Sequence, residues 1–426
     1  MLDLETIRTR TEEVRANTAN RRMTADIDKV LRLADQRSAL IAETDHLRSR
    51  RKDLAQRVPK ADTGARTALV EEASALKDTI AQREAALEKV EAELREEQAR
   101  IPNLTHPDSP IGPDESHNKE LRRWGRPPQF GFQPRDHVAL GEALDLLDFD
   151  SATRVTGANF YFLKNEAVLL ELALVRFALG AIRQEGFTLY TTPDMARMKV
   201  LEGTGFNPRG AETQIYRLEG QDLGLIATAE ITLGGLLMDQ ILEAERLPLK
   251  VGGVSHCFRV EAGAYGRASR GLYRVHQFTK VEMFAFTRPE DSDAMHLEFL
   301  RIEEGIYQRL GIPYRVVDIC TGDLGGPAYR KFDIEAWMPG RGDGGDYGEI
   351  TSASNCTDYQ ARRLGIRLRR GKGRKTELVH TLNGTAIAVS RTLIAILENC
   401  QQADGSVVVP EVLRPLAGFD RIGPRA

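Results

Sequence analysis

Arginines, carboxylates and aromatic rings are concentrated in one stretch of this 426-residue chain, residues 258–284 (FRVEAGAYGRASRGLYRVHQFTKVEMF). The sequence predicts two β-rich segments here, 254–260 and 273–286, joined by a loop. The loop contains three glycines, which permit tight turns: Gly263, Gly266 and Gly271.

Charged side chains flank this loop on both predicted strands. Because side chains alternate along a strand, Arg259 and Glu261 should share one face of the first segment. Arg274, His276 and Phe278 should likewise share one face of the second. A guanidinium can grip a phosphate with two parallel hydrogen bonds, and an aromatic ring can stack on a base. The pattern suits a nucleoside triphosphate, although a polar hairpin on a solvated sheet edge explains the same residues when they are taken alone.

The same stretch resembles motif 2 of class II aminoacyl-tRNA synthetases, in the form found in bacterial-type seryl-tRNA synthetases. The resemblance continues in order at residues 228–230 (TAE), 332–340 (FDIEAWMPG) and 380–405 (HTLNGTAIAVSRTLIAILENCQQADG). It therefore covers nearly the whole chain. It implies an α+β protein, in which an N-terminal antiparallel α-helical coiled-coil arm precedes a class II catalytic domain with a central antiparallel β-sheet flanked by helices.

The resemblance also implies which residues bind ATP. Arg259 would hold the α-phosphate during attack, and Arg274 and Arg391 would hold the γ-phosphate end of a bent ATP, so these three are the expected catalytic residues. Phe278 and Arg391 would sandwich the adenine, with Glu261 near its amino group. The full expected ATP set is Arg259, Glu261, Arg274, Val275, Phe278, Glu349, Ser352 and Arg391.

A site for serine must hydrogen-bond a hydroxyl to reject alanine and glycine, and must exclude the extra methyl group of threonine. Two carboxylates, Glu230 and Glu282, suit an ammonium and a hydroxyl. Taken alone, each carboxylate would be interpreted as an exposed surface charge. Their role in binding serine is implied by the resemblance. The implied serine-binding set is Thr228, Glu230, Arg259, Glu282, Asn383 and Thr385.

Within GEITSAS, the resemblance makes Glu349 and Ser352 the Mg²⁺ ligands, and a hard cation prefers such oxygen atoms. This segment also departs from the family pattern. Gly348 stands where arginine is common, and Thr351 and Ala353 replace residues that are usually serine and serine or cysteine. The departures leave open a secondary self-resistance paralogue that tolerates a serine-mimicking antibiotic.

Composition limits the classes of protein that this chain can belong to. It is 41% hydrophobic and 28% charged, with a net charge of −3 and no apolar run of membrane-spanning length. We expect a cytoplasmic protein without a membrane partner. The four cysteines have no spacing typical of a zinc site or a disulfide framework. The chain also lacks P-loop and dinucleotide-binding fingerprints, so it should bind a nucleotide by another device.

Heptad repeats mark residues 25–101. Leucines recur every seven residues at 33, 40, 47 and 54, and a second apolar series runs from Leu69 to Ile101. We expect Thr24 to cap the first helix near Ala25, and Pro59 and Gly64 to interrupt the pattern. The two helices should fold back on each other, because each apolar stripe must be buried.

Basic residues gather toward the expected tip of this hairpin. By resemblance the arm grips the long variable arm of tRNA(Ser). Without the resemblance, a dimerisation rod or scaffold explains the same residues, because a charge run is usually a solvated face. The candidate tRNA-binding residues are Arg50, Arg51, Lys52 and Arg57.

We expect three parts: a tRNA-binding domain at 1–101, a linker rich in Pro, Asp and Ser at 102–134, and the catalytic domain at 135–426. The helix expected at 165–186 and the strand at 187–192 before Pro193 resemble motif 1, which builds the family's homodimer. Further strands are expected at 214–218, 223–228, 314–318, 328–337 and 348–354, with helices at 135–148, 229–242 and 386–401. Many strands and few alternating helices indicate an antiparallel sheet.

The predicted function is ATP- and Mg²⁺-dependent activation of L-serine to seryl-adenylate, followed by transfer to tRNA(Ser), with tRNA(Sec) as a possible second substrate. Ligases that charge a carrier protein are related enzymes, but they lack the long arm. An inactive RNA-binding or coiled-coil paralogue is the alternative from another class. Such a paralogue should have lost Arg259, Glu282 or Arg391, and all three are present.

Overall fold

The computed structural model describes residues 1–206, 214–261 and 271–424. These residues fall into two compact units, Met1–Leu104 and Thr105–Ala426. Two glycines of the predicted loop, Gly263 and Gly266, lie outside the described residues. In the part of the chain that the structure describes, no helix is long and apolar enough to cross a membrane.

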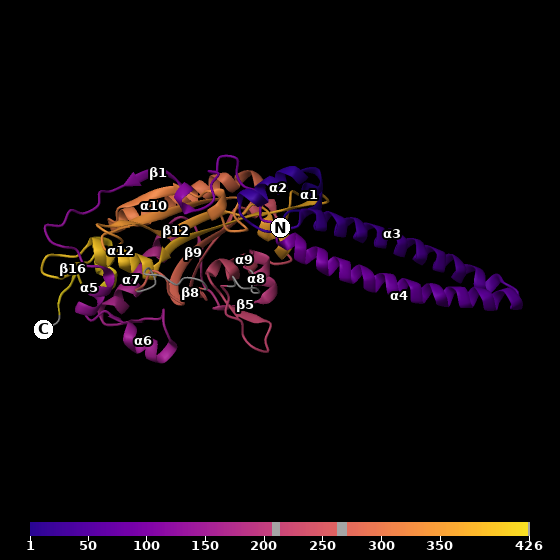
Figure 1. Cartoon of the computed structure of the whole chain (residues 1–426), viewed down its shortest axis with the longest axis horizontal. Helices are drawn as coiled ribbons and strands as arrows, with labels where there is room; N and C mark the ends of the chain where they lie inside the picture. Colours follow the sequence, from indigo (N-terminus) through magenta and orange to yellow (C-terminus); the bar gives the residue numbers. More distant parts are fainter. Residues whose placement is uncertain (207–213, 262–270, 425–426) are drawn as a thin grey trace. The chain divides into compact units, whose positions relative to one another are not determined.

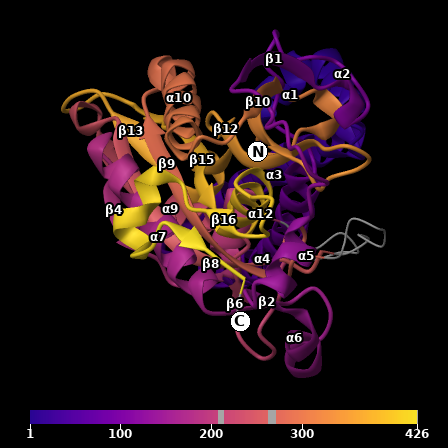
Figure 2. The ribbon, with the colours of Figure 1, turned by 90° about the vertical axis from the view of Figure 1, so that its left-hand side faces the viewer.

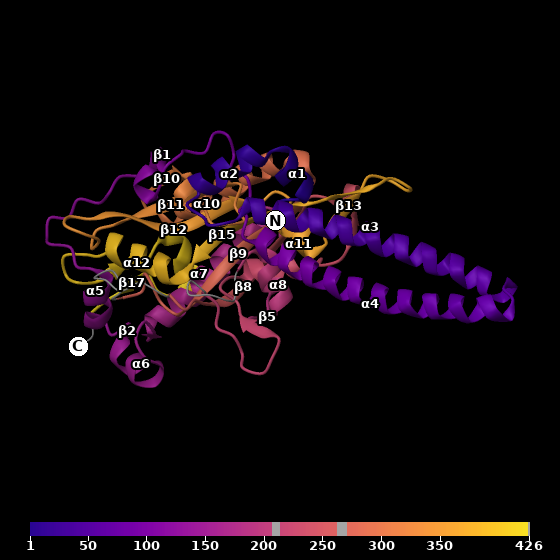
Figure 3. The ribbon, with the colours of Figure 1, turned by 45° about the vertical axis from the view of Figure 1, so that its right-hand side comes forward.

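The N-terminal unit is a helical hairpin with two short helices beside its base. Helices α3 (Ile27–Arg57) and α4 (Thr63–Ala99) lie side by side and antiparallel (Figures 1 and 3). Their 31 and 37 residues correspond to lengths of about 46 and 56 Å at 1.5 Å per residue. The predicted apolar stripes are buried at Leu33, Leu54, Leu76, Ile80 and Leu94. The coiled-coil prediction is therefore confirmed.

Two details at the helix ends differ from the prediction, and one agrees with it. Asp26, not Thr24, caps α3, because its carboxylate accepts a 2.8 Å hydrogen bond from the backbone N–H of Lys29. Pro59 lies in a short 3-10 turn, Val58–Lys60, as expected of an interruption. Gly64 is already inside the first turn of α4, so it does not interrupt that helix. Helices α1 (Leu4–Thr9) and α2 (Thr11–Asn20) pack their apolar residues against the base of the hairpin.

The C-terminal unit is built on an eight-stranded sheet. Neighbouring strands are antiparallel except β4 and β8, which run parallel at one edge. Figure 2 shows β9 and β15 side by side in the middle of the sheet. In spatial order the strands are β1 (Lys119–Trp124), β10 (Tyr314–Asp318), β11 (Arg330–Met338), β12 (Asp346–Asn355), β15 (His380–Ala388), β9 (Gln277–Thr287), β8 (Leu249–Phe258) and β4 (Thr188–Thr191).

Both faces of this sheet are covered. Along β9, Val281, Met283 and Ala285 pack into one cluster with three long helices, while Phe284 and Phe286 belong to a second cluster on the opposite face. The long helices are α7 (Glu166–Gln184), α10 (Ser292–Leu310) and α12 (Val389–Asn399), and the second face carries α9 (Ala229–Gly235) and α11 (Tyr359–Leu364). Alternation along β9 therefore places Lys280 and Glu282 on the face of α9.

Smaller elements complete this unit. The helices are α5 (His137–Ala143), α6 (Phe149–Thr156), α8 (Met198–Thr204) and α13 (Arg414–Ala417). The short strands are β2 (Leu147–Asp148), β3 (Phe162–Leu163), β5 (Met195–Arg197), β6 (Leu223–Leu225), β7 (Ile241–Glu243), β13 (Arg367–Arg369), β14 (Thr376–Leu378), β16 (Val407–Val408) and β17 (Arg421–Ile422).

Several predicted elements need correction. The segment 102–134 is not only a linker, since it contributes β1 to the large sheet. The helix expected at 229–242 ends at Gly235, and β7 follows it. The strand expected at 214–218 is reduced to a single bridge between Arg217 and Gly224. Strand β15 was not predicted, because the polar Asn383, Gly384 and Thr385 hide its buried character.

Candidate active site

A cavity opens in the C-terminal unit where two central strands separate. Pairing between β12 and β15 stops at Ala353 and Gly384, so Ser352 and Thr385 border the gap. Eight of the predicted ATP-binding or serine-binding residues line this cavity: Arg259, Glu261, Val275, Phe278, Glu349, Ser352, Thr385 and Arg391. The sequence therefore identified residues that come together from distant parts of the chain.

Arg259 lies just beyond β8 and lines the cavity. Its backbone N–H donates to the carbonyl of His276 at 2.9 Å, and its Nε donates to the carbonyl of Ala227 at 3.4 Å. Its guanidinium carbon is 5.2 Å from the centre of the Phe278 ring. A delocalised cation is thus held beside a ring that could also stack on a base.

The predicted strand faces are only partly correct here. Strand β8 ends at Phe258 and β9 begins at Gln277, so Arg259, Glu261 and Arg274 lie beyond the strand ends. Glu261 has a left-handed backbone with φ of +49°. The Arg274 side chain is half exposed, with Nη1 3.5 Å from Glu261 Oε2, and it is not among the residues that line the cavity.

Arg391 and Glu349 form the other charged side of the cavity. Arg391 lies in the first turn of α12, and its Nη1 is 3.2 Å from Glu349 Oε1. Burial would raise the pKa of Glu349, but the nearby cations Arg391, Lys331 and Arg259 together lower it to about 2. Glu349 is therefore a carboxylate at neutral pH. The guanidinium of Arg391 lies over Tyr273, 4.6 Å from the ring centre, so its sandwich with Phe278 around an adenine stays a prediction.

The residues predicted to bind serine lie next to this cavity. Glu282 on β9 is directly opposite Thr385 on β15. The Glu282 carboxylate forms an ion pair with Lys280 and accepts a 3.2 Å hydrogen bond from the hydroxyl of Thr228. Burial raises the pKa of Glu282, and the Lys280 ammonium acts in the opposite direction.

Glu230 is the second buried carboxylate of this region. Its Oε1 accepts hydrogen bonds from the side-chain amides of Gln360, at 2.7 Å, and Asn383, at 2.9 Å. Burial and the neighbouring Glu282 raise the pKa of Glu230 to about 7. The group thus changes its charge near neutral pH.

Comparison with known proteins identifies the family. Residues 1–105 match the seryl-tRNA synthetase N-terminal domain, and residues 214–400 match the tRNA synthetase class II core domain (G, H, P, S and T). The serine–tRNA ligase of Rubrobacter xylanophilus is 62% identical over 425 residues, which cover 100% of this chain and 99% of that protein. The chain belongs to the seryl-tRNA synthetase family.

Other members of the family support this assignment. The serine–tRNA ligase of Treponema denticola is 55% identical over 99% of this chain and 100% of its own length. The crystal structure of seryl-tRNA synthetase from Pyrococcus horikoshii complexed with ATP superposes with a TM-score of 0.92, at 40% identity and with 100% of both chains covered.

Sequence reasoning missed several residues around the cavity. Tyr273 and Lys280 line it, and both stand inside the motif 2 stretch, so a reading of that motif could have included them. Ile350 and Ser390 also line it. Gln360, whose amide donates to Glu230, lies outside the motifs that the sequence resembles, and its contact with a residue 130 positions away has no signal in the sequence.

The structure shows the surroundings of two residues that depart from the family pattern, Thr351 and Gly348. Thr351 lines the cavity, and its hydroxyl donates a 3.0 Å hydrogen bond to the buried carboxyl of Glu303. At Gly348, a β-carbon would lie 3.1 Å from the sulfur of Met338 and 3.2 Å from the ring of Tyr273. A larger residue there would need Tyr273 to shift, and glycine leaves that ring in place.

Proposed function

We propose that this protein activates L-serine with ATP and then transfers the serine to tRNA(Ser). A carboxylate oxygen of serine attacks the α-phosphorus of ATP, the bond from that phosphorus to the bridging oxygen breaks, and pyrophosphate leaves. One observation carries the proposal: a cavity lined by arginines adjoins a buried cluster of carboxylates. The two are in contact where Thr385, which lines the cavity, lies opposite Glu282 of the cluster. Serine-dependent exchange of pyrophosphate into ATP tests it.

Transfer of a nucleotidyl group needs in-line positioning and positive charge on the phosphate oxygens. Arg259 and Arg391 both line the cavity and would supply that charge. Glu349 is ionised, and Ser352 lines the same cavity, so this pair fits the oxygen ligands that Mg²⁺ prefers. Bound there, Mg²⁺ would neutralise charge on the phosphates.

Serine would be recognised by the buried cluster beside the cavity. Glu230 would attract the serine ammonium, and Thr228, Glu282, Asn383 and Thr385 would offer polar contacts for the rest of the amino acid. A site that hydrogen-bonds a hydroxyl strongly rejects substrates that lack it, because its buried polar groups would then stay unpaired.

This assignment makes a prediction about pH. We expect kcat/KM for serine to rise as the pH increases from about 6 to about 8, because the pKa of Glu230 is about 7 and only its ionised form attracts an ammonium. Below that pKa the carboxyl is neutral and the attraction is lost. Steady-state pyrophosphate exchange across this range measures the effect.

Glu230→Gln is the matched comparison, since the amide has nearly the same shape but does not titrate. Its kcat/KM for serine should be low and flat with pH, while its KM for ATP changes little. A wild-type profile that is flat or falling through pH 7 would remove Glu230 from the serine site.

The N-terminal unit is proposed to bind tRNA(Ser), with tRNA(Sec) as a second candidate. In this scheme residues 1–101 form the tRNA-binding domain and 135–426 the catalytic domain. Arg51 and Lys52 are exposed near the tip of the hairpin, where they could contact RNA phosphates. Arg50 is held in an ion pair with Glu72, and Arg57 lies 3.5 Å from Asp53. Arg51 and Lys52 are therefore the stronger candidates of the four.

The protein is also proposed to act as a cytoplasmic homodimer. Strand β4 lies at the edge of the large sheet, and Leu189 and Tyr190 on it are exposed. The outer side of α7 exposes Leu169 and Leu172, which is 61% exposed. The helix α7 and the strand β4 are the elements that resemble motif 1. Their exposed apolar side chains could pack against the same surface of a second copy in a symmetric dimer.

Sedimentation should accordingly give about twice the 47.4 kDa mass of one chain at micromolar concentration. Leu172→Glu should shift the protein toward the monomer, because it places a charge in the apolar contact. Leu297→Glu is the control, since Leu297 is 58% exposed on α10, outside the proposed interface. A wild-type mass near that of a single chain would contradict the dimer.

A further inference from the structure

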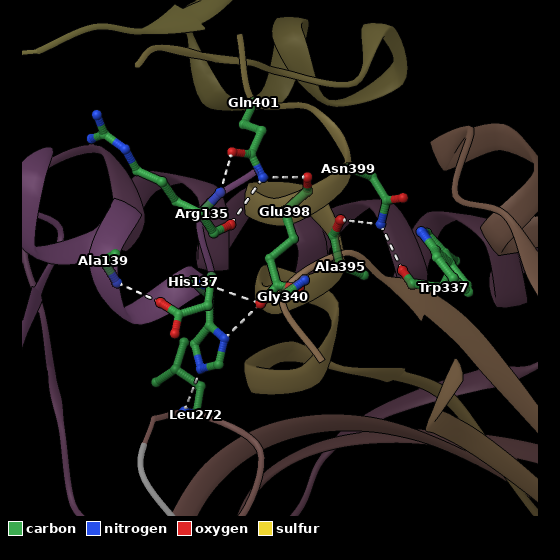
Figure 4. Close-up of polar contacts among 11 residues, drawn as sticks. Arg135, His137, Ala139, Leu272, Trp337, Gly340, Ala395, Glu398, Asn399 and Gln401 are labelled. Carbon is green, nitrogen blue, oxygen red and sulfur yellow. Dashed lines mark hydrogen bonds and ion pairs between the residues drawn. The ribbon is translucent and has the colours of Figure 1, made fainter. Parts of the chain in front are cut away.

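A buried carboxylate in the last turn of α12, that of Glu398, accepts three hydrogen bonds (Figure 4). Its Oε1 accepts from the backbone N–H of His137 at 3.0 Å and faces the ring Nδ1 of His137 at 2.8 Å. Its Oε2 accepts from the backbone N–H of Gly340 at 2.8 Å. The side chain is only 2% exposed, so these contacts replace water.

The ring of His137 bridges Glu398 and the motif 2 segment. Its Nε2 accepts a 3.2 Å hydrogen bond from the backbone N–H of Leu272. Since Nε2 accepts from an N–H, the ring proton lies on Nδ1, where it is donated to Glu398. One neutral histidine therefore links Glu398 to the backbone immediately before Tyr273.

The packing leaves this ring little freedom. A β-carbon at Gly271 would lie 2.2 Å from Nε2 of His137, so only glycine lets the backbone come so close. The chain entering α5 is fixed as well, because Arg135 and the side chain of Gln401 exchange two hydrogen bonds of 2.8 and 3.0 Å (Figure 4). His137 is thus held from both directions.

Helix α12 therefore contacts two neighbouring residues of the motif 2 segment from its two ends. Near its start, Nε of Arg391 donates to the carbonyl of Tyr273 at 3.4 Å. Near its end, Glu398 reaches the N–H of Leu272 through His137. If Arg391 turns toward a phosphate, the second link still holds the segment against the helix.

We infer that His137 and Glu398 are positioning residues for ATP, which hold residues 272–275 at a fixed distance from Arg391. Arg274 and Val275, both assigned to ATP, follow Leu272 directly in this segment. The serine-binding residues lie on other parts of the chain, at the start of α9, on β9 and β15, and just beyond β8. The inference rests on the proposed function. It predicts that the link from Glu398 through His137 to Leu272 affects the binding of ATP much more than the binding of serine.

Two substitutions cut the link at different points. The amide nitrogen of asparagine can replace Nδ1, so His137→Asn keeps a donor for Glu398 but cannot reach Leu272. The longer glutamine can offer an oxygen near the position of Nε2, so His137→Gln can accept from Leu272 but loses the contact with Glu398. Each is expected to raise KM for ATP about tenfold in pyrophosphate exchange, with KM for serine changed less than about twofold.

His380→Asn is the control, since Nδ1 of His380 also makes a 2.9 Å hydrogen bond, to Ser292, at the far end of β15. It should leave both KM values unchanged. An unchanged KM for ATP in the variants at position 137 would overturn the inference. Equal rises in the KM values for ATP and serine, together with a lower melting temperature, would also overturn it, because they would show a general loss of stability. A wild-type protein without serine-dependent exchange would instead overturn the proposed function.

Discussion

Arg259→Ala is expected to lower the kcat of serine-dependent pyrophosphate exchange about 100- to 1,000-fold, the usual effect of removing one donor that stabilises a transition state. Arg259 lines the cavity together with Thr385, which borders the proposed serine site. We therefore expect its guanidinium to face the phosphate that a serine carboxylate attacks. Quenched-flow or steady-state exchange measures the loss.

Arg259→Lys separates charge from geometry. Lysine keeps the positive charge but loses the planar fork that grips two oxygens, so most of the loss should remain. Melting temperatures of both variants should stay near that of the wild type, because among the described residues the side chain makes one hydrogen bond, of 3.4 Å to the carbonyl of Ala227, besides its contact with the Phe278 ring. Exchange within a few-fold of wild type would show that Arg259 does not act on the reacting phosphate.

Shortening the hairpin is expected to abolish aminoacylation while leaving serine activation almost unchanged. The structure indicates where to cut. Leu33, Ala34 and Leu94 belong to the core at the base, and Arg37 pairs with Glu91 at 2.8 Å, so the base should be kept. Replacing residues 42–85 by a short Gly-Ser linker removes the tip and preserves this base.

The expected result follows from the position of the assigned residues. All the residues assigned to ATP, Mg²⁺ or serine lie in the C-terminal unit, so pyrophosphate exchange should persist. Charging of tRNA(Ser) should collapse, because phosphate contacts supply much of the affinity for RNA. If the shortened protein charges full-length tRNA(Ser) as well as the intact one, the hairpin is a scaffold and not an RNA-binding arm.

A milder change, Arg51→Ala with Lys52→Ala, should raise KM for tRNA and reduce its dependence on salt, since each lost phosphate contact lowers the slope of the logarithmic plot by about 0.7 to 0.9. Arg83→Ala is a suitable comparison, because Arg83 already forms an ion pair with Glu43 at 3.0 Å on the same hairpin.

The sequence predicted best where the pattern is local. The heptad leucines predicted the helical hairpin, because a coiled coil buries a periodic apolar stripe independently of the rest of the fold. The cap of α3 was misplaced by two residues, since both Thr24 and Asp26 can cap a helix and only the backbone decides between them.

The site was predictable in its residues but not in its arrangement. Glu282 and Thr385 were both assigned to serine from motif resemblance, yet their direct opposition depends on the register of β9 against β15, which no local pattern specifies. Gln360 and His137 act through contacts between segments far apart in the chain. Such partners become visible only when the fold has brought them together.

Serine-dependent ATP–pyrophosphate exchange, measured with each of the standard amino acids in turn, tests the central claim most directly. Serine should support rapid exchange, and alanine, which lacks the hydroxyl, should be about 10⁴-fold less effective in kcat/KM. Threonine should also be a poor substrate, because a site for serine must exclude its extra methyl group. Exchange that depends equally on another amino acid, or no exchange with serine at all, would contradict the account.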